Sequence, residues 1–158
     1  MRKSFFILIF LLFLFFILFV NACAKQQNQN SIPAISANDV SKLTPEQVVI
    51  LYFQSWNNKK YDVMYSLISD GFKKIEPTAN TFDDFQLYMD SFFETEKSVN
   101  ILESKQAYQS ENEAGVNYRI EITRKDSSKK EFENAYTLKK RENGWKLIHP
   151  YGENIDTS

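Results

Sequence analysis

The order of apolar and polar residues divides the chain into an apolar start, a polar stretch and a long region with regular periodicity. Residues 5–20 are apolar without interruption, and Arg2 and Lys3 precede them. Residues 24–43 show no apolar period and are rich in Gln, Asn and Ser, which is typical of a tether. The remaining residues, 44–158, are predicted to fold as one domain.

Three helices are predicted in the first half of this domain. The motif Thr44-Pro45-Glu46-Gln47 is typical of a helix start, because a threonine can cap free amide groups and a proline suits the first helical position. Apolar residues then recur at helical spacing as far as Trp56. A second helix is expected over 61–68, with Asp70-Gly71 as its end, and a third over about 81–96.

After Val99 the apolar residues alternate with polar ones, which is the period of a β-strand. Strands are predicted over 99–109, 116–123, 132–138 and 145–149. The segments Asp126-Ser127-Ser128 and Glu142-Asn143-Gly144 are predicted to be turns, the second of them a tight hairpin turn. Helices followed by a strand meander indicate an α+β fold, in which three helices pack on one face of a four-stranded antiparallel sheet.

The N-terminal segment resembles a bacterial lipoprotein signal peptide. The only cysteine, Cys23, follows Val20-Asn21-Ala22 at the end of the apolar run. The resemblance implies that residues 1–22 are removed and that Cys23 carries a diacylglyceryl group, so that 23–43 is a lipidated tether. The alternative is an uncleaved transmembrane anchor, although a 16-residue run spans roughly 24 Å and a bilayer core is about 30 Å thick. Both alternatives place the domain outside the cytoplasm, anchored to a membrane.

Composition excludes several classes of function. Removal of residues 1–22 leaves 17 basic and 20 acidic residues, and a formal charge of −3 does not suggest a nucleic-acid binder. Seven Phe, eight Tyr and two Trp remain, which is enough to fill a core. With Cys23 used for lipid, no thiol is left for a disulfide, a nucleophile or a zinc site.

Two groups of residues carry a second resemblance. One is the opening 44–49 with Tyr52, Phe53, Trp56 and 61–69, and the other is the closing segment 136–147 with its Gly-Trp-Lys motif. The domain resembles the nuclear transport factor 2-like superfamily, which includes ketosteroid isomerase and SnoaL-type proteins. The resemblance implies a cone-shaped fold with a curved sheet, an apolar pocket at one end, and pairing of two copies through the open sheet face.

Three residues are candidates for ligand binding in such a pocket, namely Tyr118, Tyr136 and His149. The tyrosines belong to inward-facing positions of their strands, and His149 alternates with Trp145 and Leu147. A histidine titrates near neutral pH and could serve as a pocket acid or base. The alternatives are equally physical, since large aromatic residues also fill cores, and a histidine at a strand end also bonds to backbone or water.

The sequence offers little support for catalysis or for a cofactor. Asp62, Asp83 and Asp84 are explained as acidic residues at helix starts, and a single histidine among scattered carboxylates lacks the spacing of a zinc site. With four glycines in the whole chain there is no Gly-rich phosphate loop. Four basic residues at one hairpin tip (Arg124, Lys125, Lys129 and Lys130) form either a solvated loop or a contact for an anionic surface.

We therefore expect a membrane-anchored, extracytoplasmic lipoprotein that is a non-enzymatic binding module for a small apolar ligand or a protein partner. One alternative is an interaction protein with a filled core that forms a homodimer or binds an envelope protein. The other is an enzyme similar to ketosteroid isomerase, which would need a carboxylate base inside an apolar cavity. No metal, cofactor or nucleic acid is expected.

Overall fold

The computed structural model describes residues 37–150, which belong to the second of two units of the chain, Ala34–Ser158. The predicted signal peptide and Cys23 lie outside the described residues. The helical elements are η1 (Ala37–Lys42), α2 (Pro45–Asn57), α3 (Tyr61–Leu67), α4 (Asp70–Ile75), η2 (Pro77–Ala79) and α5 (Phe82–Thr95). The strands are β1 (Glu96–Gln109), β2 (Glu113–Arg124), β3 (Lys129–Arg141) and β4 (Gly144–Leu147).

Helix α2 begins where its capping residues predict. The Gln47 amide donates to Thr44 Oγ1 at 3.3 Å, and the Thr44 amide donates to Gln47 Oε1 at 2.9 Å, which is a complete capping box. Most α2 side chains are buried, from Val48 to Phe53 without interruption. The helix therefore lies inside the domain rather than on its surface.

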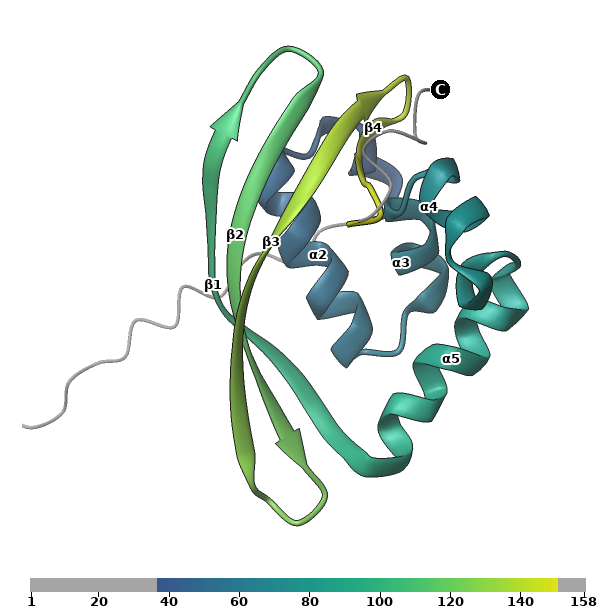
Figure 1. The fold of residues 1–158 in the computed structure, drawn as a ribbon, viewed down its shortest axis with the longest axis vertical. Coiled ribbons are helices and arrows are strands. Elements are labelled where there is room, and N and C mark those ends of the chain that lie inside the picture. Colours follow the sequence, from purple (N-terminus) through teal and green to yellow (C-terminus); the bar gives the residue numbers. More distant parts are fainter. Residues whose placement is uncertain (1–36, 151–158) are drawn as a thin grey trace, which may run out of the picture. The chain divides into compact units, whose positions relative to one another are not determined.

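The four strands form one antiparallel meander in the order β1-β2-β3-β4, which confirms the expected α+β class. Helix α2 lies against β1, β2 and β4, and the helices occupy one side of the strongly twisted sheet (Figure 1). The inner face carries apolar cross-strand neighbours such as Val116 and Tyr136. The outer face is charged, and Arg119 forms ion pairs there with Glu131 at 2.9 Å and with Glu103 at 3.6 Å.

The folded part of the chain begins earlier than the sequence predicts. Val40 and Leu43 fall within the predicted tether 23–43, yet both are buried in the core cluster. η1 packs against the β3–β4 turn, where Gly144 has a φ of 103°. A Cβ at Gly144 would lie 2.9 Å from both the Ser41 Cα and the Val40 carbonyl oxygen, so only glycine fits there. The folded unit thus extends back at least to η1.

The predicted end of the second helix is wrong. Asp70 and Gly71 do not terminate α3, which ends at Leu67, but begin the further helix α4. The Ser69 side chain caps α4 by accepting from the Phe72 amide at 2.9 Å. Ile68 bridges to Leu147 of β4 in parallel, and the Ser69 amide donates to the Leu147 carbonyl. This tertiary contact holds 68–69 extended, and so separates two helices where local signals indicated one.

Candidate functional site

The structure brings two of the predicted ligand-binding residues into direct contact on the inner face of the sheet. Tyr118 of β2 and Tyr136 of β3 are stacked, with ring centroids 4.9 Å apart and an interplanar angle of 22°. From α2, the ring of Phe53 lies 4.8 Å from Tyr118, and the ring of Tyr52 lies 6.0 Å from Tyr136. These four residues, called the aromatic cluster below, pack against one another between α2 and the sheet.

The hydroxyl groups of the aromatic cluster are held neutral. Burial raises the pKa of Tyr52 and of Tyr136 well above the usual value for tyrosine, and burial also raises the pKa of Tyr118. The Tyr136 hydroxyl is hydrogen-bonded to that of Tyr118. The cluster can therefore exchange hydrogen bonds with a ligand, but it carries no charge at neutral pH.

The structure places His149 at a different contact, against α4. β4 ends at Leu147, so His149 follows the strand instead of lying in it as predicted. Its ring packs edge-on against Phe72, with centroids 4.9 Å apart, and its Nε2 lies 3.5 Å from Glu76 Oε2. The pKa of Glu76 is lowered, first by the hydrogen bond from the Thr78 hydroxyl and to a lesser extent by His149.

A cavity of about 560 Å³ opens at the junction of α3, α4 and the β3–β4 turn. Its polar lining has three basic side chains and two acidic ones, together with the hydroxyls of Ser66 and Ser69; the charged residues are Lys73, Arg141, Lys146, Asp70 and Glu142. We call this site the polar cavity. Sequence reasoning did not identify it, because its residues come from segments about 75 positions apart that form no recognisable motif.

Lys146 is the buried cation of the polar cavity. The residue is 7% exposed, and its Nζ donates to the Ser66 carbonyl oxygen at 2.5 Å, near the C-terminal end of α3. Burial lowers the pKa of Lys146, and repulsion from Lys73 adds to this effect. A lysine is seldom buried to this extent unless an acidic group pairs with it.

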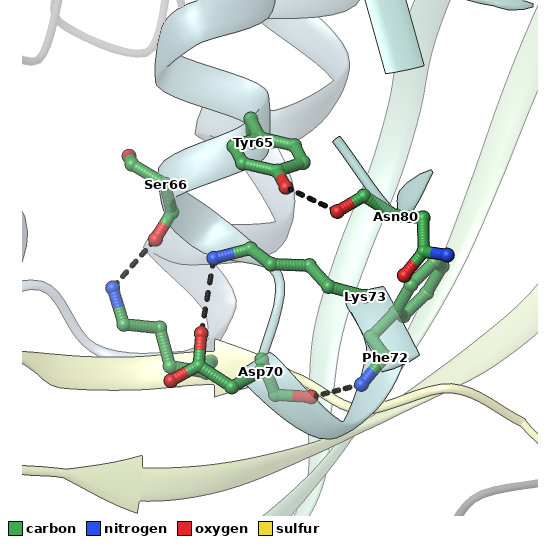
Figure 2. Close-up of polar contacts among 8 residues, drawn as sticks. Tyr65, Ser66, Asp70, Phe72, Lys73 and Asn80 are labelled. Carbon is green, nitrogen blue, oxygen red and sulfur yellow. Dashed lines mark hydrogen bonds and ion pairs between the residues drawn. The ribbon is translucent and has the colours of Figure 1, made fainter. Parts of the chain in front are cut away.

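Lys73 is the second cation of the polar cavity, and its neighbours hold it in place. Its Nζ lies 3.2 Å from Asp70 Oδ1, and it lies 4.6 Å from the centroid of the Tyr65 ring (Figure 2). The Tyr65 hydroxyl lies 3.5 Å from the Asn80 carbonyl oxygen, so the ring beneath the ammonium is itself fixed. Asp70 is largely exposed, which leaves it open to solvent and to ligand.

Residues 37–150 contain no group of three or more His, Cys, Asp or Glu side chains that could hold a metal ion. Asp62, Asp83 and Asp84 are exposed at the starts of their helices, as the sequence predicts. Within the same range, every helix is too short or too polar to cross a membrane.

Comparison with known proteins identifies a family and a fold. The model of the NTF2-like N-terminal transpeptidase domain matches residues 44–150. No curated protein matches the chain. A SEC-C motif containing protein from Rhodopseudomonas palustris is similar in structure, with a TM-score of 0.53 and 12% identity over 72% of this chain and 85% of that one.

Two further solved structures are similar to this chain at a lower TM-score. A ketosteroid isomerase-like protein from Erwinia carotovora atroseptica has a TM-score of 0.47 and 20% identity over 65% of this chain and 86% of its own. An NTF2-like protein of unknown function from Burkholderia pseudomallei has a TM-score of 0.46 and 8% identity over 72% of this chain and 89% of its own.

Proposed function

The chain belongs to the family of NTF2-like N-terminal transpeptidase domains, and from this premise we propose that it is a non-enzymatic binding module of the bacterial cell envelope. A lipid on Cys23 anchors it to the membrane, on the extracytoplasmic side. The family description ties this kind of domain to transpeptidases, which supports a role in the envelope, and the lipoprotein-like signal of residues 1–23 supports the same location.

The polar cavity is the binding site in this proposal. The observation that carries it is a volume of about 560 Å³ next to Lys146, a buried cation that forms no ion pair within residues 37–150. Cavities of about 300–1,000 Å³ are typical of small-molecule sites. The cone interior is a weaker candidate, because the aromatic cluster packs its side chains against one another there.

Two observations support binding over catalysis and over a homodimer. Asp62, Asp83 and Asp84 lie exposed at helix starts, whereas an isomerase of this fold needs a carboxylate base in an apolar cavity. The outer sheet face carries Arg119 and its acidic partners. Such a charged surface does not offer the apolar contact area that a stable homodimer requires.

Native mass spectrometry of the full chain, extracted in detergent from its own membranes, tests this function. The wild type is expected to carry a non-covalent small-molecule mass, and a Lys73→Gln, Arg141→Gln double variant is expected to lose it. The control is Lys130→Gln, which removes the same kind of charge at the far end of β3. A wild type without bound mass, or a cavity variant that keeps it, refutes the proposed function.

A further inference from the structure

We infer that the polar cavity binds a small molecule through a carboxylate group, and that Lys146 is the residue that holds this carboxylate. The inference rests on the proposed function, since it names the class of ligand for the same site. It follows from the hydrogen-bonding capacity of Lys146, from the charge balance of the cavity and from its size.

The ammonium of Lys146 has more donors than the protein uses. A lysine has three N–H bonds to donate, and one of them is directed at the Ser66 carbonyl oxygen. Within residues 37–150 no carboxylate forms an ion pair with this ammonium. Capping the end of α3 explains one donor but not the burial of a full charge, because a neutral donor would satisfy the same carbonyl at a smaller desolvation cost.

The charge of the polar cavity favours a ligand with a single negatively charged group. Lys73, Arg141 and Lys146 contribute three positive charges, while Asp70 and Glu142 contribute two negative ones, so the formal sum is +1. A ligand with one carboxylate stays within this sum, also when it carries an ammonium group that pairs with Asp70 or Glu142. A phosphate monoester carries about −1.5 to −2 at neutral pH and would exceed it.

A bound carboxylate would also reduce the repulsion between Lys73 and Lys146. Lys73 and Lys146 repel each other, and Asp70 offsets the repulsion only in part from its exposed position. A carboxylate between the two ammonium groups would relieve this repulsion. Binding should therefore favour the charged form of Lys146, and affinity should fall at alkaline pH as Lys146 loses its proton.

The size and the acidic residues of the cavity indicate what is attached to the carboxylate. A volume of about 560 Å³ is far larger than an acetate ion, and it has room for an amino acid or a short peptide. Asp70 and Glu142 could then accept hydrogen bonds from an ammonium group of the same ligand. A zwitterionic amino acid or short peptide with a free C-terminus is the class that this lining fits.

Isothermal titration of the full-length protein in detergent with trialanine and with trialanine amide tests the inference, because the two peptides differ only in the carboxylate. We expect the free acid to bind at least about tenfold more tightly than the amide, since a charge-assisted hydrogen bond is lost. Lys146→Met keeps the aliphatic stem and should weaken trialanine binding by at least about tenfold, while Lys130→Gln should leave it within about twofold.

The remaining arms keep the test decisive. If circular dichroism shows that Lys146→Met does not fold, Lys146→Gln takes its place, because its side-chain amide can still donate a hydrogen bond while the positive charge is removed. Equal affinity for the acid and the amide, undiminished binding by the folded variant, or no binding of trialanine overturns the inference. Tighter binding of inorganic phosphate than of trialanine also overturns it, in favour of a phosphate ligand. If native mass spectrometry finds a ligand that depends on the polar cavity but lacks a carboxylate, this inference is wrong while the proposed binding function stands.

Discussion

At the scale of single residues, the two tyrosines predicted to bind a ligand also pack against each other and carry no charge at neutral pH. The rings of Tyr118 and Tyr136 stack at 4.9 Å, and Phe53 and Tyr52 cover them from α2. Aromatic pairs of this kind contribute about 0.5–1.5 kcal/mol beyond the area that they bury. Because burial raises the pKa of Tyr136, its hydroxyl keeps its proton in the folded state at pH values where an unfolded chain would lose it.

The pKa of the buried tyrosines is higher in the folded than in the unfolded chain. The free energy of unfolding should therefore fall as pH rises above about 10, where the unfolded chain releases tyrosine protons that the folded chain retains. Tyr136→Phe should remove one such contribution, up to about 1.4 kcal/mol per pH unit. Urea unfolding between about pH 8 and 11 measures the slope.

The matched control is Tyr88→Phe, since Tyr88 is 55% exposed. Lys146 has the opposite effect on this pH dependence, because its lowered pKa makes the free energy of unfolding rise with pH. Since Lys146 is present in every variant, its contribution cancels in the comparison. If Tyr136→Phe shows the same alkaline slope as the wild type, the account of a buried, neutral hydroxyl is wrong.

The sequence allowed the two tyrosines to be placed but not the lysine. Alternation along β2 and β3 predicts that Tyr118 and Tyr136 face inward, and the structure places them there. Lys146 lies in the Gly-Trp-Lys segment, which sequence reasoning used only as a mark of the fold. Its partner Ser66 is 80 positions away, so no local pattern could reveal the contact.

At the scale of secondary-structure elements, local capping signals decided where helices begin. Thr44 and Thr81 both accept a hydrogen bond from the amide three residues ahead, and α2 and α5 begin directly after them. These elements were predictable because the capping residues lie within one turn of the amide groups that they satisfy.

The capping box of α2 can be tested directly. Thr44→Ala removes the acceptor for the Gln47 amide and should lower the free energy of unfolding by about 0.5–2 kcal/mol. Chemical denaturation of the full chain measures this loss. Thr44→Ser keeps the hydroxyl oxygen and should retain most of the stability. A serine variant as unstable as the alanine variant would show that the threonine methyl group, and not the cap, is responsible.

Elements that depend on distant contacts were not predictable in the same way. α4 and η1 were missed, since α4 separates from α3 only because Ile68 bridges to β4, and η1 is held by the close approach of Gly144 to Ser41. The strand order and the turns followed from sequence period and turn residues. The polar cavity lies where α4 meets the β3–β4 turn, so the missed helix and the missed site have the same cause.

At the scale of the whole molecule, the described domain has three chemically different surfaces. The inner sheet face carries the aromatic cluster, the outer face carries the ion pairs of Arg119, and the polar cavity lies at the α3–α4 junction. At the polar cavity, a volume of about 560 Å³ adjoins the buried Lys146, whose ammonium forms no ion pair within residues 37–150. Under the proposed function, the lipid expected on Cys23 would hold the polar cavity at the membrane surface.

Cys23→Ala tests the anchor. Acyl chains contribute about 0.8 kcal/mol per buried methylene, and one chain binds a membrane only weakly, so firm anchoring requires the two or three chains of a bacterial lipoprotein. The wild type should therefore enter the detergent phase as a processed protein that has lost residues 1–22. The alanine variant should be released into the soluble fraction or remain as an unprocessed precursor, because it lacks the thiol that carries the lipid.

The control is Gln26→Ala, three positions further along, which should behave as the wild type. If Cys23→Ala fractionates and migrates like the wild type, or if the wild type keeps Met1 and an unmodified thiol by mass analysis, the domain is not held by lipid and the proposed location of the polar cavity is wrong.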